Sequence, residues 1–247
     1  MGSKKYKGKP CVYCVDGVSS DGEHIVSREF FPPTSRGNLP KAPACRRCND
    51  EKSKLEHYLT AVLPFSSEHE TALKGQTEKV RQRLNKNKAL KNELRSGINP
   101  VSMKTKNGSL EDTISLPFQP EKITEYCKYI VRGLVWHEWN VIIPKEYIVE
   151  VFPFRQHAYI FFHDRVLTMS PNFRRHGILA SGGFEYTCTR SSTDAAFSAW
   201  HLKFYENMLL AGEVAEDKLE CIEFCALTGP PTIRPIVERL RGNSEKT

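Results

Sequence analysis

Four cysteines stand in two close pairs, Cys11-x2-Cys14 and Cys45-x2-Cys48. Each pair places two thiolates on one tight turn, and together the pairs supply the four sulfur ligands of a tetrahedral zinc site. Eight cysteines in 247 residues, half of them so arranged, are typical of metal binding in a reducing compartment rather than of a disulfide scaffold. Because four protein ligands close the coordination sphere, we expect a structural Zn2+, and any catalysis must use other residues.

Polar residues of other types lie between the cysteine pairs and just after them. Glu23 and His24 are adjacent, and Asn38 follows within Gly-Asn-Leu. The second cysteine pair leads directly into Asn49 and then Lys52. The order Glu-His, Gly-Asn-Leu, Cys-x2-Cys-Asn-x2-Lys resembles the HNH endonuclease family in its zinc-stabilised ββα-metal version. The resemblance covers the chain from the first cysteine pair to the helix expected after the second.

This resemblance implies a role for each of these residues. A hairpin would present Glu23 and His24 side by side, and Glu23 and Asn49 would hold one Mg2+ or Mn2+ through oxygen. Many members have Asp and His at those two positions, but Glu and Asn still offer oxygen donors. His24 would act as the general base toward water, and Asn38 would orient its ring. The metal would stabilise the leaving 3′ oxygen, so the products would carry 5′-phosphate and 3′-hydroxyl ends.

Positive charge is concentrated in the first part of the chain. The net charge is +7, and the whole excess lies before residue 107. Such a distribution suits a polyanion, and nucleic acid is the first partner to consider. The basic surface of residues 69–95 either contacts phosphates or is merely solvated, and Lys52, one turn after Asn49, has the same two interpretations. The nucleic-acid contacts that we expect are Arg46, Arg47, Lys52, Lys79, Arg81, Arg83, Lys86 and Lys88.

Apolar spacing predicts the elements that carry these side chains. One helix should begin near Arg46 and end before Pro64, and a second should cover residues 69–95. A stretch rich in Gly, Pro, Asn and Ser predicts a linker over residues 96–119, and Pro120 begins a third helix. Runs of period two then predict antiparallel strands in VIIPKEYIVEVF, HAYIFFH, GFEYTCTR, FSAWHLKFY and LECIEFCAL.

The predicted fold class is α+β. A small N-terminal ββα-metal zinc module over residues 1–63 is followed by the basic helix and linker over 64–118, and then by an α+β domain with an antiparallel sheet over 119–247. For this last domain, regulation, partner binding and oligomerisation all stay open. No apolar run approaches the roughly 20 residues of a membrane span, and the basic N-terminus leads into no apolar signal segment. We therefore expect a cytoplasmic protein without a membrane partner.

Three functions are consistent with these patterns. The first is a metal-dependent HNH endonuclease, a hydrolase of phosphodiester bonds. On family grounds it acts on double-stranded DNA, with RNA and single strands left open, and it would suit a restriction, phage-defence or mobile-element effector. The second is a non-catalytic zinc-knuckle module that only binds nucleic acid. In the third, the C-terminal domain senses a protein or small ligand and restrains the nuclease.

Overall fold

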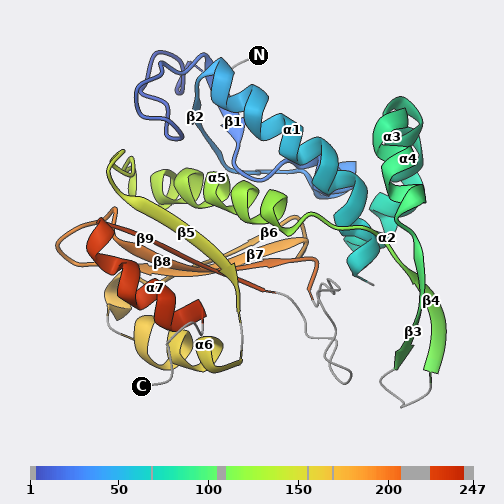
Figure 1. The fold of residues 1–247 in the computed structure, drawn as a ribbon. Coiled ribbons are helices and arrows are strands. Elements are labelled where there is room, and N and C mark those ends of the chain that lie inside the picture. Colours follow the sequence, from blue (N-terminus) through green and yellow to red (C-terminus); the bar gives the residue numbers. More distant parts are fainter. Residues whose placement is uncertain are drawn as a thin grey trace.

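A computed structural model of the chain describes residues 4–67, 69–104, 110–154, 156–168, 170–206 and 223–241. The elements form layers (Figure 1). An N-terminal hairpin and helix lie on one side of helix α5 (Pro120–Trp139), and an antiparallel sheet lies on the other. Two short helices cover the far face of that sheet. The fold is α+β with an antiparallel sheet, as predicted.

The N-terminal module is a hairpin followed by a helix. Strands β1 (Asp21–His24) and β2 (Lys41–Ala44) pair antiparallel, and short 3-10 turns occupy part of the loop between them. Helix α1 (Arg46–Val62) begins immediately after β2. Its predicted limits, near Arg46 and before Pro64, are confirmed. The order strand, strand, helix is the ββα order that the sequence led us to expect.

The basic stretch predicted as one helix over residues 69–95 consists of shorter pieces. These pieces are α2 (Glu70–Gly75), a π-helical turn (Gln76–Val80), α3 (Arg81–Lys86) and α4 (Lys88–Ser96). The chain breaks at Asn87, whose side chain accepts a hydrogen bond from the Leu90 amide and so caps α4. Asn favours such a cap over a helix interior, because its side chain competes for backbone hydrogen bonds.

The predicted linker over residues 96–119 contains regular structure. Strands β3 (Asn99–Lys104) and β4 (Leu110–Ser115) form a two-stranded hairpin that projects from the body (Figure 1). Asn107-Gly108, between the two strands in the sequence, is a strong local signal for a hairpin. The linker prediction is wrong over these residues because an exposed hairpin does not need the apolar periodicity that marks a buried strand.

The second sheet has the strand order β5-β9-β8-β7-β6. Its strands are β5 (Ile148–Pro153), β6 (Arg175–Leu179), β7 (Phe184–Arg190), β8 (Ser198–Phe204) and β9 (Phe224–Gly229). The strand predicted at HAYIFFH is wrong: the chain there forms α6 (Gln156–Phe161) and a π-helical turn (Phe162–Val166). A short apolar run does not distinguish strand from helix, and here burial of Phe162 against the sheet decides. Helix α7 (Arg234–Arg241) packs beside α6 on the same face.

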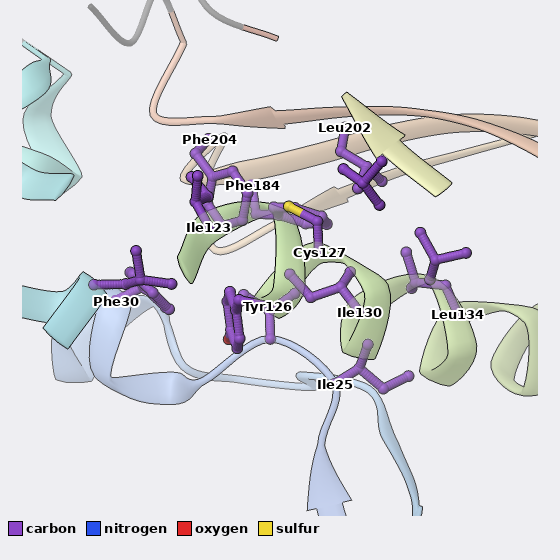
Figure 2. Packing of buried hydrophobic residues seen from close by; sticks show 14 of the residues in the cluster. Ile25, Phe30, Ile123, Tyr126, Cys127, Ile130, Leu134, Phe184, Leu202 and Phe204 are labelled. Carbon is purple, nitrogen blue, oxygen red and sulfur yellow. The ribbon is translucent and has the colours of Figure 1, made fainter. Parts of the chain in front are cut away.

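Helix α5 joins the two halves of the molecule through one hydrophobic core. Figure 2 shows Tyr126 and Ile130 of this helix between Ile25 of the N-terminal module and Leu202 of the sheet. At Gly133 the approach is so close that a Cβ atom would lie 2.9 Å from two side-chain carbons of Ile25. The core is continuous across the predicted boundaries at residues 63 and 118. Among the described helices, none combines the length and apolar character that a membrane crossing requires.

Candidate functional site

The four cysteine sulfurs of the two pairs converge on one point. They all lie within 4.8 Å of one another, and Cys14 Sγ is 3.7 Å from Cys45 Sγ. A tetrahedral zinc with Zn–S bonds of about 2.3 Å separates neighbouring sulfurs by roughly 3.8 Å. The cluster is therefore positioned to bind a metal ion, and its all-sulfur donor set suits zinc. In the described part of the chain, no other group of three or more His, Cys, Asp or Glu side chains converges in this way.

Local backbone structure brings the two pairs together. In the first pair, the Cys11 amide donates to Gly17 O at 2.7 Å, and Val15 adopts a left-handed conformation with φ 67°. Gly17 allows close contact, because a Cβ atom there would lie 2.9 Å from Cys45 Sγ. The second pair is the start of α1: Cys45 is its N-cap and Cys48 lies in its first turn. The positive end of the helix dipole stabilises thiolates at this position.

Glu23 and His24 are the last two residues of strand β1. Glu23 faces α1, where Lys52 Nζ lies 3.6 Å from its Oε1 atom. His24 shares its face with Lys41, its antiparallel partner. Partial burial, reinforced by the positive charge of Lys41, lowers the pKa of His24 to about 4. The imidazole is therefore neutral at pH 7, which is the form that accepts a proton.

Lys52 differs from its predicted place at a phosphate, because its side chain is 0% exposed. Its ammonium group donates to the His24 carbonyl at 2.8 Å and forms ion pairs with Glu23 and Glu56. The Tyr126 hydroxyl of α5 donates to Glu56 at 3.3 Å, and the Tyr126 ring lies 5.5 Å from Lys52 Nζ. The contacts of the Lys52 ammonium group and of Glu56 therefore link the hairpin, α1 and α5 inside the protein. The spacing of Glu56 four residues after Lys52 was the available sequence signal for the pair.

Asn49 lies one turn before Lys52 on the hairpin-facing side of α1. Its Oδ1 atom is buried and, within the described residues, has no hydrogen-bond partner. A buried acceptor without a partner costs about 1–3 kcal/mol, which a bound ligand would relieve. A hard divalent cation bound by Asn49 Oδ1 and the Glu23 carboxylate would supply one. These two oxygen donors therefore fit the chemistry of Mg2+ or Mn2+. Burial raises the pKa of Glu23, although Lys52 opposes this effect.

Asn38 is the residue expected to orient the His24 ring. It occupies an exposed turn before β2, with a left-handed φ of 56°. Asn tolerates this conformation better than most residues, and this gives Asn38 a local structural role. Its side chain forms no hydrogen bond with any described residue, and neither ring nitrogen of His24 has a partner in that part of the chain.

Five of the predicted nucleic-acid contacts are exposed. Arg46 and Arg47 lie at the start of α1, inside the second cysteine pair, and the Arg46 side chain is 91% exposed. Arg81, Lys86 and Lys88 are exposed on α3 and α4. Two separate basic surfaces result, one beside the cysteine cluster and one on the helical segment that follows α1. Both are accessible to a polyanion.

The two other predicted contacts on the basic segment bind the protein itself. Arg83 donates to the Glu29 carboxylate at 2.8 Å and to Thr60 O at 3.0 Å. Lys79 donates to Phe31 O at 3.2 Å and lies 3.8 Å from the Glu29 carboxylate. These side chains fasten the loop after β1 to the helical segment, so their charges are partly neutralised. Their primary role in this structure is to fix the loop.

No model of a protein family matches this chain, and no curated protein or solved structure matches it either. The function of the chain is therefore inferred from its residues and their geometry. The most informative features are the four-cysteine cluster, the hairpin and the helix that begins inside the cluster.

Proposed function

We propose that the chain is a metal-dependent HNH endonuclease that hydrolyses phosphodiester bonds, with double-stranded DNA as the first substrate to test. The observation that carries the proposal is the orphaned Oδ1 atom of Asn49 on the helix that faces the Glu23–His24 hairpin. The cysteine cluster supports it, because a closed zinc site would fix the start of that helix against the hairpin.

In this proposal the protein groups have separate tasks. Glu23 and Asn49 would hold one Mg2+ or Mn2+, which when bound neutralises charge on the scissile phosphate and on the leaving oxygen. The neutral His24 imidazole would take a proton from the attacking water. Lys52 would fix both Glu23 and the backbone of His24. Arg46 and the exposed residues of the basic segment would contact phosphates without reading sequence.

A non-catalytic module that binds nucleic acid is the second candidate. The observation in its favour is the ammonium group of Lys52, which already neutralises Glu23 at 3.6 Å without a metal ion. The exposed position of Asn38 points the same way, since it leaves the His24 ring without the expected partner. Such a module would use the same zinc cluster and the same basic surfaces, but it would not cut.

The two candidates are separated by incubating the purified full chain with supercoiled plasmid, linear duplex, single-stranded DNA and RNA. Each polymer is tested with Mg2+, with Mn2+ and with EDTA, and the zinc content is measured after each treatment. The nuclease proposal predicts cleavage of duplex DNA that stops in EDTA while zinc is retained. Binding of these polymers without cleavage under any condition would overturn it and favour the second candidate.

A further inference from the structure

A small basic pocket lies at the C-terminal end of α5. It has a volume of about 340 Å³ and opens between the N-terminal segment, the residues before β2 and the end of the helix. Three lysines, Lys5, Lys9 and Lys41, line it together with the aromatic residues Tyr6 and Trp136. We call it the lysine–tryptophan pocket. Its volume is at the lower end of the roughly 300–1,000 Å³ range of small-ligand sites.

The lining combines positive charge with aromatic surface. Lys9 Nζ lies 5.7 Å from the ring centre of Trp136, and Lys5 Nζ lies 5.6 Å from that of Tyr6. The two rings are themselves 5.7 Å apart. Among the described residues, no carboxylate forms an ion pair with Lys9 or Lys41. The carbonyl end of α5 contributes only about half a negative charge, which the ammonium groups of Lys9 and Lys41 outweigh.

Lys41 places this pocket beside His24. The two residues are directly paired across β1 and β2, so their side chains lie on the same face of the hairpin. Directly opposite side chains have Cβ atoms about 5 Å apart, which is less than the length of one nucleotide. A strand whose phosphate lies at His24 would therefore continue into the pocket.

We propose that the lysine–tryptophan pocket holds one unpaired nucleotide that flanks the scissile phosphate. The lysines contact its phosphate, and its base lies against the half-buried ring of Tyr6 and the small part of Trp136, 8% of its surface, that stays exposed. Charged grooves with aromatic side chains bind single strands in this way, because a base face is free to stack only when it is unpaired and unstacked. The preferred substrate is then DNA that is locally single-stranded at the cut. The position of the cut rests on the proposed function, but nucleotide binding in the pocket does not.

The test measures binding by tryptophan fluorescence, in EDTA and with His24→Ala protein, so that cleavage does not contribute. The probes are a short single-stranded oligothymidylate and a fully paired duplex of equal length. Lys9→Ala is compared with Lys128→Ala, which removes one charge from α5 at a position about 12 Å along that helix from Trp136. Circular dichroism melting confirms that both variants fold.

We expect Lys9→Ala to weaken oligothymidylate binding about tenfold and to reduce its salt dependence by about one released ion, since one phosphate contact is lost. Duplex binding and Lys128→Ala should change much less. Equal effects of the two substitutions, or equal loss for both probes, would overturn the pocket. Because cleavage is measured separately, a protein that never cuts but shows Lys9-dependent binding would keep the pocket and lose the nuclease proposal.

Discussion

At the scale of single residues, Lys52 and Asn49 lie on one face of α1 but differ in whether their buried polar atoms have partners. Lys52 is wholly buried and fully partnered, whereas Asn49 Oδ1 is buried without a partner. Helical spacing in the sequence correctly places both residues on one face. It does not show how deep that face lies, because burial of Lys52 depends on Tyr126, which lies far along the chain in α5. Similarly, the Gly-Asn-Leu pattern singles out Asn38 as a site residue. Its positive φ is a separate, structural reason for an asparagine at this position.

Replacing Lys52 with alanine should strongly destabilise the protein. Glu23 and Glu56 would lose their shared counter-charge in a buried setting, which typically costs about 3–5 kcal/mol. The measurement is the free energy of unfolding in urea. Lys54→Ala, which removes an exposed lysine from the same helix, is the control and should change it by less than about 0.5 kcal/mol. Similar values for the two variants would show that Lys52 does not hold the hairpin.

Replacing Asn49 with alanine should weaken metal use without destabilising the protein. Its buried Oδ1 atom has no hydrogen-bond partner to lose, so without added Mg2+ or Mn2+ the free energy of unfolding should not fall, and removal of the unpaired acceptor should raise it by up to about 1–3 kcal/mol. The Mn2+ concentration needed for half-maximal cleavage should rise at least about tenfold. A variant with native Mn2+ dependence would remove Asn49 from the proposed ligand set.

At the scale of elements, α5 does most to position the site. Its Pro120 start was predicted from sequence, and its buried residues contact the hairpin on one side and the sheet on the other. Strands β7 and β8 were also predicted, because aromatic and β-branched residues alternate in them. Helix α6 and the break at Asn87 were not predicted. Tertiary packing determines that α6 is a helix, and the side-chain cap of Asn87 determines the break.

Gly133→Ala should destabilise the protein, although an alanine normally stabilises a helix by about 1 kcal/mol relative to glycine. The added methyl group would lie 2.9 Å from two carbons of the fully buried Ile25, and overpacking of this kind costs about 1–3 kcal/mol. Unfolding in urea measures the effect. The double variant Gly133→Ala/Ile25→Ala should be less destabilised than the sum of its single changes. Simple additivity of the two effects would contradict the contact.

At the scale of the whole molecule, the two faces of the large sheet carry different chemistry. One face holds α5 and, beyond it, the cysteine cluster and hairpin (Figure 1). The other holds a hydrogen-bonded chain in which His163 Nε2 lies 3.1 Å from His201 Nδ1, and His201 Nε2 lies 2.5 Å from Glu223. Lys203 pairs with the second carboxylate oxygen of Glu223 at 3.0 Å. The sequence shows no ligand spacing between these two histidines, because they come from a π-helical turn and from strand β8, which are far apart in the chain.

Because of this hydrogen-bonded series of side chains, we expect the free energy of unfolding to fall in acid. Burial, with the neighbouring charges of His201 and Arg174, lowers the pKa of His163. As the pH falls below about 6.5, the unfolded state therefore binds a proton at His163 before the folded state does. The contribution of His163 to the free energy of unfolding is complete above that pH and is lost as the pH falls through the folded pKa. Burial alone would raise the pKa of Glu223, but His201 and Lys203 outweigh burial and lower it. The lowered pKa of Glu223 also makes the free energy of unfolding fall in acid, at a lower pH than for His163.

The measurement is the free energy of unfolding at about pH 7.5 and at about pH 5.5, on either side of the ordinary histidine pKa. His163→Gln should lose less stability between these two values than the native protein. His57→Gln, which changes an exposed histidine of α1, should behave like the native protein. Any release of zinc in acid is common to all three proteins, so only their differences bear on His163. Equal losses in all three would contradict the role of His163.

The proposed nuclease is tested most directly by comparing His24→Ala with His57→Ala on labelled duplex DNA in Mn2+. The account predicts that His24→Ala reduces the cleavage rate by roughly 10²- to 10⁴-fold, since a general base contributes about that much. Its zinc content and melting temperature should match those of the native protein, and His57→Ala should cut at the native rate. If His24→Ala cuts as fast as the native protein, the hairpin histidine is not the general base, and the proposed site is wrong.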